Sequence, residues 1–294
     1  MPTVYEIVTQ TIIEKLEAGE IPWRRPWVTS APKNLVSGKE YRGINTFMLG
    51  VSGFPRPEWL TFNQAAKLGA TVRAGERSNM VVYFNVGEER LNAKTGKLSK
   101  PFLLRYSRVF NISQCDHGEQ TLTAKLGLDA TKSAPVPSIE ACDAIVCGMP
   151  NRPHVKASDR AWYRPSTDEV GMPDKSTFHS SEGFYATLFH ELTHSTAHPS
   201  RVGRPEVMES QAFGSATYSR EELIAEMGAA MLCGVAGVSP ATVENSAAYL
   251  RSWISALRGD SKLVVAAASG AQKAADYIRG IVAKSSSESE TVEA

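Results

Sequence analysis

Residues 190–194 read His-Glu-Leu-Thr-His, a pattern that can bind a metal ion when it lies on a helix. Residues four positions apart on an α-helix lie one turn above each other, so the imidazoles of His190 and His194 can reach one ion. The carboxylate of Glu191 would project beside the open coordination position, where it can exchange protons with water. The alternative is a pair of structural histidines satisfied by hydrogen bonds. The motif predicts Zn²⁺ as cofactor, with Glu191 as the catalytic residue.

A catalytic zinc ion usually takes three protein ligands, so a third must come from another segment. His198 follows the motif by four residues, but the chain is leaving the helix there. A second apolar helix is predicted over residues 219–233, and it carries Glu222 and Glu226 one turn apart. One of them could bind the metal while the other orients a histidine. The E-x-x-A-acid spacing of metallopeptidases favours Glu222 as the metal ligand. A capping box that starts at Ser219 would instead occupy Glu222 with a backbone hydrogen bond and leave Glu226 as the ligand.

Several other elements follow from the local pattern. The motif helix is expected over residues 184–198, with polar capping groups at 180–182. Apolar residues from Val4 to Leu16 recur at helical spacing and predict an opening helix that stops at Gly19. The remaining predictions are strands over 79–86 and 102–110, a helix over 58–68 and a hairpin excursion over 87–100.

The charge is distributed unevenly along a chain of 294 residues with a net charge of +1. Up to Ser113 there are 16 Lys and Arg against 9 Glu and no Asp, a net charge of +7, whereas the rest carries 16 basic and 22 acidic residues, a net charge of −6. A chance distribution is the simpler explanation, but the split favours an N-terminal part that binds polyanions. No apolar run approaches the ~20 residues that span a bilayer, so we expect a cytoplasmic protein with no membrane partner. The four cysteines form no C-x-x-C pair, which argues against a cysteine zinc finger.

The basic part interleaves aromatic rings, guanidinium groups and amides in three short segments. Single-stranded nucleic acid binds such mixtures, because bases stack on rings and phosphates pair with arginine. Aromatic residues beside proline also serve as core residues, so this signal is weak by itself. The candidate DNA-binding residues are Trp23, Arg24, Arg25, Trp27, Tyr41, Arg42, Asn45, Trp59, Asn63 and Gln64.

Composition also divides the chain. Residues 118–138 lack aromatic side chains and are rich in Thr, Lys, Ala and Pro, which predicts a linker. Residues 285–294 are polar and acidic, which predicts a disordered tail. We therefore expect an α+β protein with two domains. The first, over 1–117, is a mixed α/β domain that contains the basic aromatic segments, and the second, over 139–284, contains the histidine motif.

Blocks spread over the chain resemble the signature blocks of ArdC-type antirestriction proteins. The resemblance runs in block order from about Val4 to Tyr277. The blocks are Tyr41-Arg-Gly-Ile-Asn45, Trp59-Leu-Thr-Phe-Asn-Gln64, Val109-Phe-Asn-Ile-Ser-Gln114, Trp162-Tyr-Arg-Pro-Ser-Thr-Asp168, Met172-Pro173 and Thr187-Leu-Phe-His-Glu-Leu-Thr-His194.

This resemblance implies a single-stranded DNA-binding domain followed by a zincin-like metallopeptidase domain. It also implies a plasmid-encoded protein that protects incoming DNA from host restriction during conjugation. Two other functions are compatible with the residues. The protein could shield DNA with a structural zinc site and an idle Glu191, or it could cleave a host regulator while the basic part binds protein.

Overall fold

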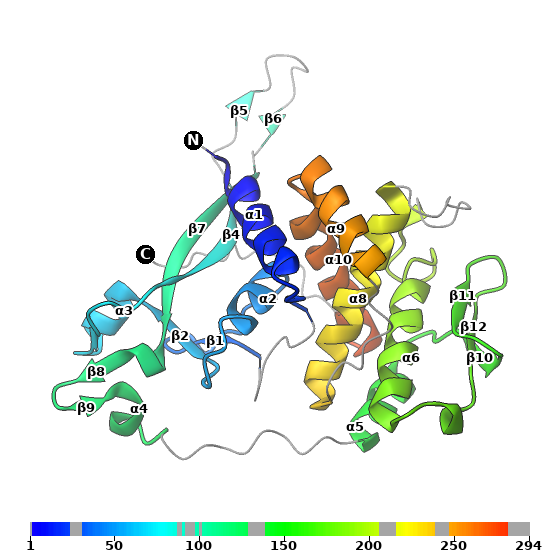
Figure 1. Ribbon diagram of the computed structural model, residues 1–294, viewed down its shortest axis with the longest axis horizontal. Helices are drawn as coiled ribbons and strands as arrows, with labels where there is room; N and C mark the ends of the chain where they lie inside the picture. Colours follow the sequence, from blue (N-terminus) through cyan, green and yellow to red (C-terminus); the bar gives the residue numbers. More distant parts are fainter. Residues whose placement is uncertain are drawn as a thin grey trace.

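The computed structural model describes residues 2–23, 31–86, 90–91, 98–99, 102–128, 139–205, 216–238 and 247–281. Figure 1 shows a strand-rich N-terminal half on one side and a helix-rich C-terminal half on the other, with helix α1 (Val4–Glu17) between them. Both halves mix helices and strands, which confirms the predicted α+β class.

Helix α1 has the boundaries that its apolar spacing predicted. The Thr3 hydroxyl accepts a hydrogen bond from the backbone N–H of Glu6, and the Glu6 carboxylate accepts one from the N–H of Thr3. Beyond the last turn, Gly19 has a φ of 77°, in the left-handed region that favours glycine. The buried face of the helix includes Val8 and Ile12.

A four-stranded sheet forms the centre of the N-terminal half, in the order β1 (Lys33–Asn34), β2 (Glu58–Thr61), β7 (Phe102–Asn111) and β4 (Asn79–Val86). β1 and β2 are parallel, and the other neighbours are antiparallel. β4 and β7 confirm the two predicted strands. The helix predicted over 58–68 is wrong for its first four residues, which form β2, because β2 pairs on both sides and is wholly buried. Helix α3 (Phe62–Lys67) follows directly.

Smaller elements complete this half. The predicted excursion contains the antiparallel pair β5 (Arg90–Leu91) and β6 (Leu98–Ser99). A second sheet has the order β3 (Thr71–Val72), β8 (Cys115–His117) and β9 (Gln120–Thr121), and it lies beside the 3₁₀ turn η1 (Ile112–Gln114) and helix α4 (Leu122–Lys125).

The predicted linker begins too early. Leu122 is 1% exposed and packs in one cluster with Leu60 and Ile112, so residues 118–128 belong to the N-terminal half. The physical reason is that Leu122 and Leu128, apolar residues of a polar stretch, pack against this cluster and hold β9 and α4 to the core. Residues 129–138 and the predicted tail over 285–294 lie outside the described residues.

The C-terminal half places a small sheet against helices. The sheet has the order β10 (His154–Ala157), β12 (Glu169–Met172) and β11 (Trp162–Arg164), with β10 parallel and β11 antiparallel to β12. The helical elements among its described residues are α5 (Ile139–Gly148), η2 (Lys175–Thr177), α6 (Ser181–Ser195), α8 (Ala216–Ala236), α9 (Ala247–Gly259) and α10 (Leu263–Ile278). In the described part of the chain, no helix is long and apolar enough to cross a membrane.

The two halves share a hydrophobic core. Ile12 of α1 and Trp23 lie in the same cluster of buried residues as Trp253 of α9, and the two indole rings meet edge to face at 5.3 Å. The Thr9 hydroxyl also donates a hydrogen bond of 2.7 Å to the carbonyl of Ser261. Helix α2 (Ile44–Gly50) contributes to the same cluster. Because the core crosses the expected domain boundary, experiments on either half should use the whole chain.

Candidate functional site

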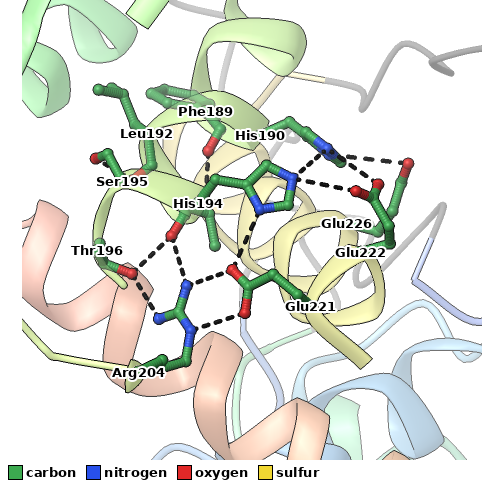
Figure 2. Close-up of polar contacts among 11 residues, drawn as sticks. Phe189, His190, Leu192, His194, Ser195, Thr196, Arg204, Glu221, Glu222 and Glu226 are labelled. Atoms are coloured by element: carbon green, nitrogen blue, oxygen red, sulfur yellow. Dashed lines mark hydrogen bonds and ion pairs between the residues drawn. The ribbon is translucent and has the colours of Figure 1, made fainter. Parts of the chain in front are cut away.

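Helix α6 positions the histidine pair. The Ser180 hydroxyl caps its first turn by accepting a hydrogen bond from the N–H of Gly183, as the polar residues before the motif predicted. Leu192 is fully buried and anchors the helix to the core. On the adjacent face, the Nε2 atoms of His190 and His194 lie 3.1 Å apart (Figure 2). The two imidazoles therefore direct the same ring nitrogen to one point.

Helix α8 brings a carboxylate to that point. Glu222 Oε2 lies 3.6 Å from Nε2 of His190, and Glu222 Oε1 lies 3.6 Å from Nε2 of His194. One ligand atom from each of the three residues lies within 4.8 Å of the others, which is close enough to hold one metal ion. Ser219 lies inside α8 and not before its first residue, so the capping box that would have occupied Glu222 is absent from this helix.

Glu226 takes a different position. Its Oε1 lies 3.9 Å from Nδ1 of His190, on the ring edge that faces away from the Nε2 pair. Nδ1 of His190 is buried and has no hydrogen-bond partner among the described residues. A small movement of the carboxylate would make that hydrogen bond, which fits a residue that orients His190. Glu191 follows His190 on α6 and is 8% exposed.

Two residues of the site were missed by sequence reasoning. Glu221 Oε1 lies 3.2 Å from Nδ1 of His194, and Arg204 binds both carboxylate oxygens of Glu221 at 2.6 and 2.8 Å. Arg204 is buried and also donates hydrogen bonds to the hydroxyl of Thr196 and the carbonyl of Thr193, which tie it to the end of α6 (Figure 2). The adjacent acids at 221 and 222 were a signal for Glu221, but no local pattern pointed to the arginine.

The charges of the site shift the pKa values of its members. Burial alone would lower the pKa of His194, but the hydrogen bond to Glu221 and the charge of Glu222 raise it to about 9. Burial alone would raise the pKa of Glu222, but the hydrogen bond from His190 and the charge of His194 lower it to about 2. Before a metal binds, the carboxylates therefore stabilise a proton on the histidine pair at neutral pH.

Metal binding should release protons at pH 7 and weaken as the pH falls. A metal ion and a proton compete for the same imidazole nitrogen, and a group with a pKa of about 9 keeps its proton below that pH. The apparent affinity should therefore fall by about tenfold for each pH unit between pH 9 and pH 7. Calorimetric titration in two buffers of different ionisation enthalpy counts the protons. Metal binding without proton release at pH 7 would contradict this electrostatic picture.

The two helices of the site approach each other closely. A Cβ atom added at Gly228 of α8 would lie 2.6 Å from Cγ2 and 2.8 Å from Oγ1 of Thr193 on α6. Thr193 is fully buried, and its hydroxyl donates to the carbonyl of Phe189. Gly228 therefore sets the separation of the helices that carry the histidines and the carboxylate.

The candidate DNA-binding tryptophans are core residues, and their prediction as stacking surfaces is wrong. Trp23 and Trp59 are each 2% exposed. Trp23 packs on Trp253, and Trp59 packs edge to face on Phe54 at 5.5 Å. Burial of a large apolar ring is favourable enough that indoles beside proline or in a central strand fill the interior.

The polar candidates mostly serve the fold. The Asn45 amide exchanges two hydrogen bonds of 2.7 Å with the backbone of Val82, and the Gln64 amide accepts from the N–H of Thr61. Both amides therefore satisfy backbone groups of the fold, and their contact with DNA stays a prediction.

Tyr41, Arg42 and Asn63 have mixed surroundings. Burial raises the pKa of Tyr41, whose hydroxyl lies 3.4 Å from the Asn34 amide. Arg42 is half exposed and forms an ion pair with Asp276 of α10. Asn63 is exposed on α3. The candidates Arg24, Arg25 and Trp27 lie outside the described residues.

Comparisons with known proteins place the chain in a family. Residues 2–110 match the model of the N-terminal domain of anti-restriction factor ArdC, and residues 141–270 match that of a zincin-like metallopeptidase. The crystal structure of antirestriction protein ArdC from plasmid R388, in its metal-free form, superimposes with a TM-score of 0.76 at 38% identity, covering 95% of this chain and 97% of that one. The chain belongs to the ArdC antirestriction family. This confirms the resemblance found in the sequence blocks.

Other ArdC relatives extend the comparison. The Mn(II)-bound structure of the R388 protein gives a TM-score of 0.75 at 36% identity over 96% of this chain and 99% of that one. A protein named DNA primase TraC from Escherichia coli is 35% identical over 99% of this chain, but the chain spans only 28% of its length. An uncharacterized protein of Sinorhizobium fredii, y4eC, is 32% identical over 94% of this chain and 91% of its own length. The zincin-like fold, together with the His-His-Glu cluster, implies a site for a divalent metal.

Proposed function

We propose that this protein protects incoming DNA from restriction during conjugative transfer, by binding the single strand and by hydrolysing a peptide bond in a protein substrate. The observation that carries the hydrolytic part is the convergence of two Nε2 atoms and one carboxylate beside a buried Glu191. The net charge of +7 before residue 113 supports the DNA-binding part. Both activities would operate in the cytoplasm of the cell that receives the DNA.

The donor set suits zinc. Two imidazole nitrogens and one carboxylate oxygen are the protein ligands of many catalytic zinc sites, and they leave a fourth position for water or substrate. We assign His190, His194 and Glu222 as these ligands. The Mn(II)-bound form of the R388 protein is a reason to test manganese beside zinc.

Each remaining residue of the site has a role in this proposal. The bound metal would supply Lewis acidity that makes a water molecule nucleophilic and polarises the scissile carbonyl. Glu191 accepts a proton from that water and passes it to the leaving amine. Glu221, held by Arg204, accepts a hydrogen bond from Nδ1 of His194 and so keeps its Nε2 lone pair directed at the ligand point.

The Glu191→Gln variant tests the proposal. The amide keeps the shape of the carboxylate but cannot accept the proton, and it removes no metal ligand. We expect normal metal content, normal DNA binding and loss of protection. Conjugation frequencies into a restricting and a non-restricting recipient, with wild type and variant in parallel, measure protection. Host proteins that are shortened only with wild type would identify the substrate.

Two outcomes would favour other functions. Full protection by Glu191→Gln would reject the hydrolytic part and leave a protein that shields DNA and uses its metal to stabilise the fold. Loss of metal from Glu191→Gln would instead mean that Glu191 is a ligand. Cleavage of a host regulator without any affinity for single strands would favour a peptidase whose basic half binds protein.

A further inference from the structure

The long ribbon of β4 and β7 presents two exposed aromatic rings. The strands pair from Asn79 opposite Val109 to Val86 opposite Phe102. In this register Val82 lies opposite Tyr106 and Phe84 lies opposite Leu104. Residues directly opposite each other share a face, as do residues two apart on one strand, so Phe84 and Tyr106 lie on the same face.

These rings are unusual for their exposure. Phe84 is 45% exposed and Tyr106 is 44% exposed, whereas the tryptophans first predicted to stack on bases are each 2% exposed. Figure 1 shows α1 and α2 on one side of the ribbon. The face that carries the two rings also carries Val82, which is buried in the main core, so the rings lie at the margin of that core. An exposed large aromatic side chain costs the protein buried apolar area, so a neighbouring pair on one face indicates a binding surface.

Positive charge accompanies the rings. Arg108 lies opposite Met80, which puts it on the same face as Phe84 and Tyr106, and its guanidinium donates to the neutral hydroxyl of Ser78 at 3.3 Å. Arg105, also exposed, lies opposite Tyr83 and therefore on the other face. Neither β4 nor β7 contains an aspartate or a glutamate. The surface is thus aromatic and basic, which complements a polyanion with flat, apolar rings.

The spacing suits unstacked bases. Diagonal neighbours such as Phe84 and Tyr106 lie about 7 to 8 Å apart across antiparallel strands. This is about twice the 3.4 Å step between stacked bases, so a base can contact each ring only where the strand has been pulled out of its own stack. A duplex keeps its base faces covered and cannot use both rings.

We propose that Phe84, Tyr106 and Arg108 form the surface on which single-stranded DNA binds. Two bases stack on the rings, and a phosphate pairs with the guanidinium. The assignment rests on the proposed DNA-binding function and replaces the buried tryptophans as its structural basis.

The test uses the full chain and a fluorescently labelled twenty-nucleotide oligo-dT, followed by anisotropy. Phe84→Ala and Tyr106→Ala should each weaken binding by about 5- to 150-fold, the range that alanine substitution of a stacking ring produces. Tyr106→Phe should bind like wild type, because the ring is retained. Arg108→Gln should lower the slope of log Kd against log salt by about 0.7, the contribution of one phosphate contact on a single strand.

The chain supplies matched controls. Phe62 on α3 is 60% exposed but lies off the ribbon, and Arg105 is an exposed arginine of the same strand on the opposite face. Phe62→Ala and Arg105→Gln should leave the affinity within about twofold of wild type, as expected for exposed sites outside the contact.

The possible results distinguish an error in the proposed binding surface from an error in the proposed DNA-binding function. Tight binding by Phe84→Ala and Tyr106→Ala would overturn the surface while DNA binding itself stands. Equal losses of DNA affinity in Arg105→Gln and Arg108→Gln would overturn the assignment of binding to the face of the ribbon that carries Arg108. A wild-type protein that binds oligo-dT no better than a duplex of equal length would overturn the proposed preference for single strands, and the surface with it.

Discussion

Replacement of Glu222 by alanine should abolish stoichiometric binding of a divalent metal, whereas replacement of Glu226 should weaken binding by only about 10- to 100-fold. The reason is geometric. Both oxygens of Glu222 lie 3.6 Å from an Nε2 atom of the histidine pair, whereas Glu226 approaches His190 at Nδ1, on the other ring nitrogen. Removal of one of three ligands leaves two imidazoles, which hold zinc poorly.

Metal analysis after dialysis and calorimetric titration of the purified variants measure this difference. Glu226→Ala is the matched control, since it removes the same group one turn further along α8. The double variant His190→Ala, His194→Ala should also lose its metal. Retention of one metal per chain by Glu222→Ala, together with its loss from Glu226→Ala, would reverse the assignment of the two carboxylates.

The substitution Gly228→Ala should damage both stability and metal affinity. Alanine favours a helix over glycine by about 1 kcal/mol, so an unconstrained site would gain stability. At Gly228 the new methyl group would lie 2.6 Å from Thr193, and overpacking of this kind costs about 1 to 3 kcal/mol. The expected net effect is a lower free energy of unfolding. Any displacement of α8 also moves Glu222 away from the histidines, so metal affinity should fall more than tenfold, as for a misplaced ligand contact.

Chemical denaturation with and without metal measures both effects. Gly259→Ala is the control, because a Cβ atom there meets nothing within 4 Å. The double variant Gly228→Ala, Thr193→Ala removes the opposing side chain and should regain part of the metal affinity, since contacting residues are not additive. If Gly228→Ala matches Gly259→Ala in stability and metal affinity, the close approach of the two helices does not control the site.

Helices and strands with strong internal patterns were predictable. The helix α1, the strands β4 and β7 and the motif helix α6 depend on apolar spacing and on capping groups a few residues away, so the local sequence contains their causes. The residues of β2 were wrongly predicted to be helical. Their strand conformation is imposed by pairing with β7, more than forty residues away in the chain, and the local sequence does not contain this cause. Leu122 was also wrongly assigned, to a linker, because its burial depends on contact with Leu60, which is distant in the sequence.

The candidate metal site was likewise predictable from the sequence only in part. The spacing of His190 and His194 on one helix face follows from the helical repeat alone, and the acidic helix that completes the site was recognisable by its composition. The choice of Glu222 as the carboxylate nearest both histidines depends on how α8 is rotated against α6, which the contact of Gly228 with Thr193 decides.

The sequence alone determined that this chain would carry a helical His-Glu-x-x-His motif, a basic N-terminal part and the blocks of its family, because these are properties of neighbouring residues and of composition. Only the tertiary structure decided which side chains reach solvent. Trp23 is buried because α1 and α9 pack together from opposite ends of the chain, while Phe84 and Tyr106 stay exposed on the ribbon. Exposure depends on contacts between segments hundreds of residues apart, and no local pattern encodes which of those contacts form.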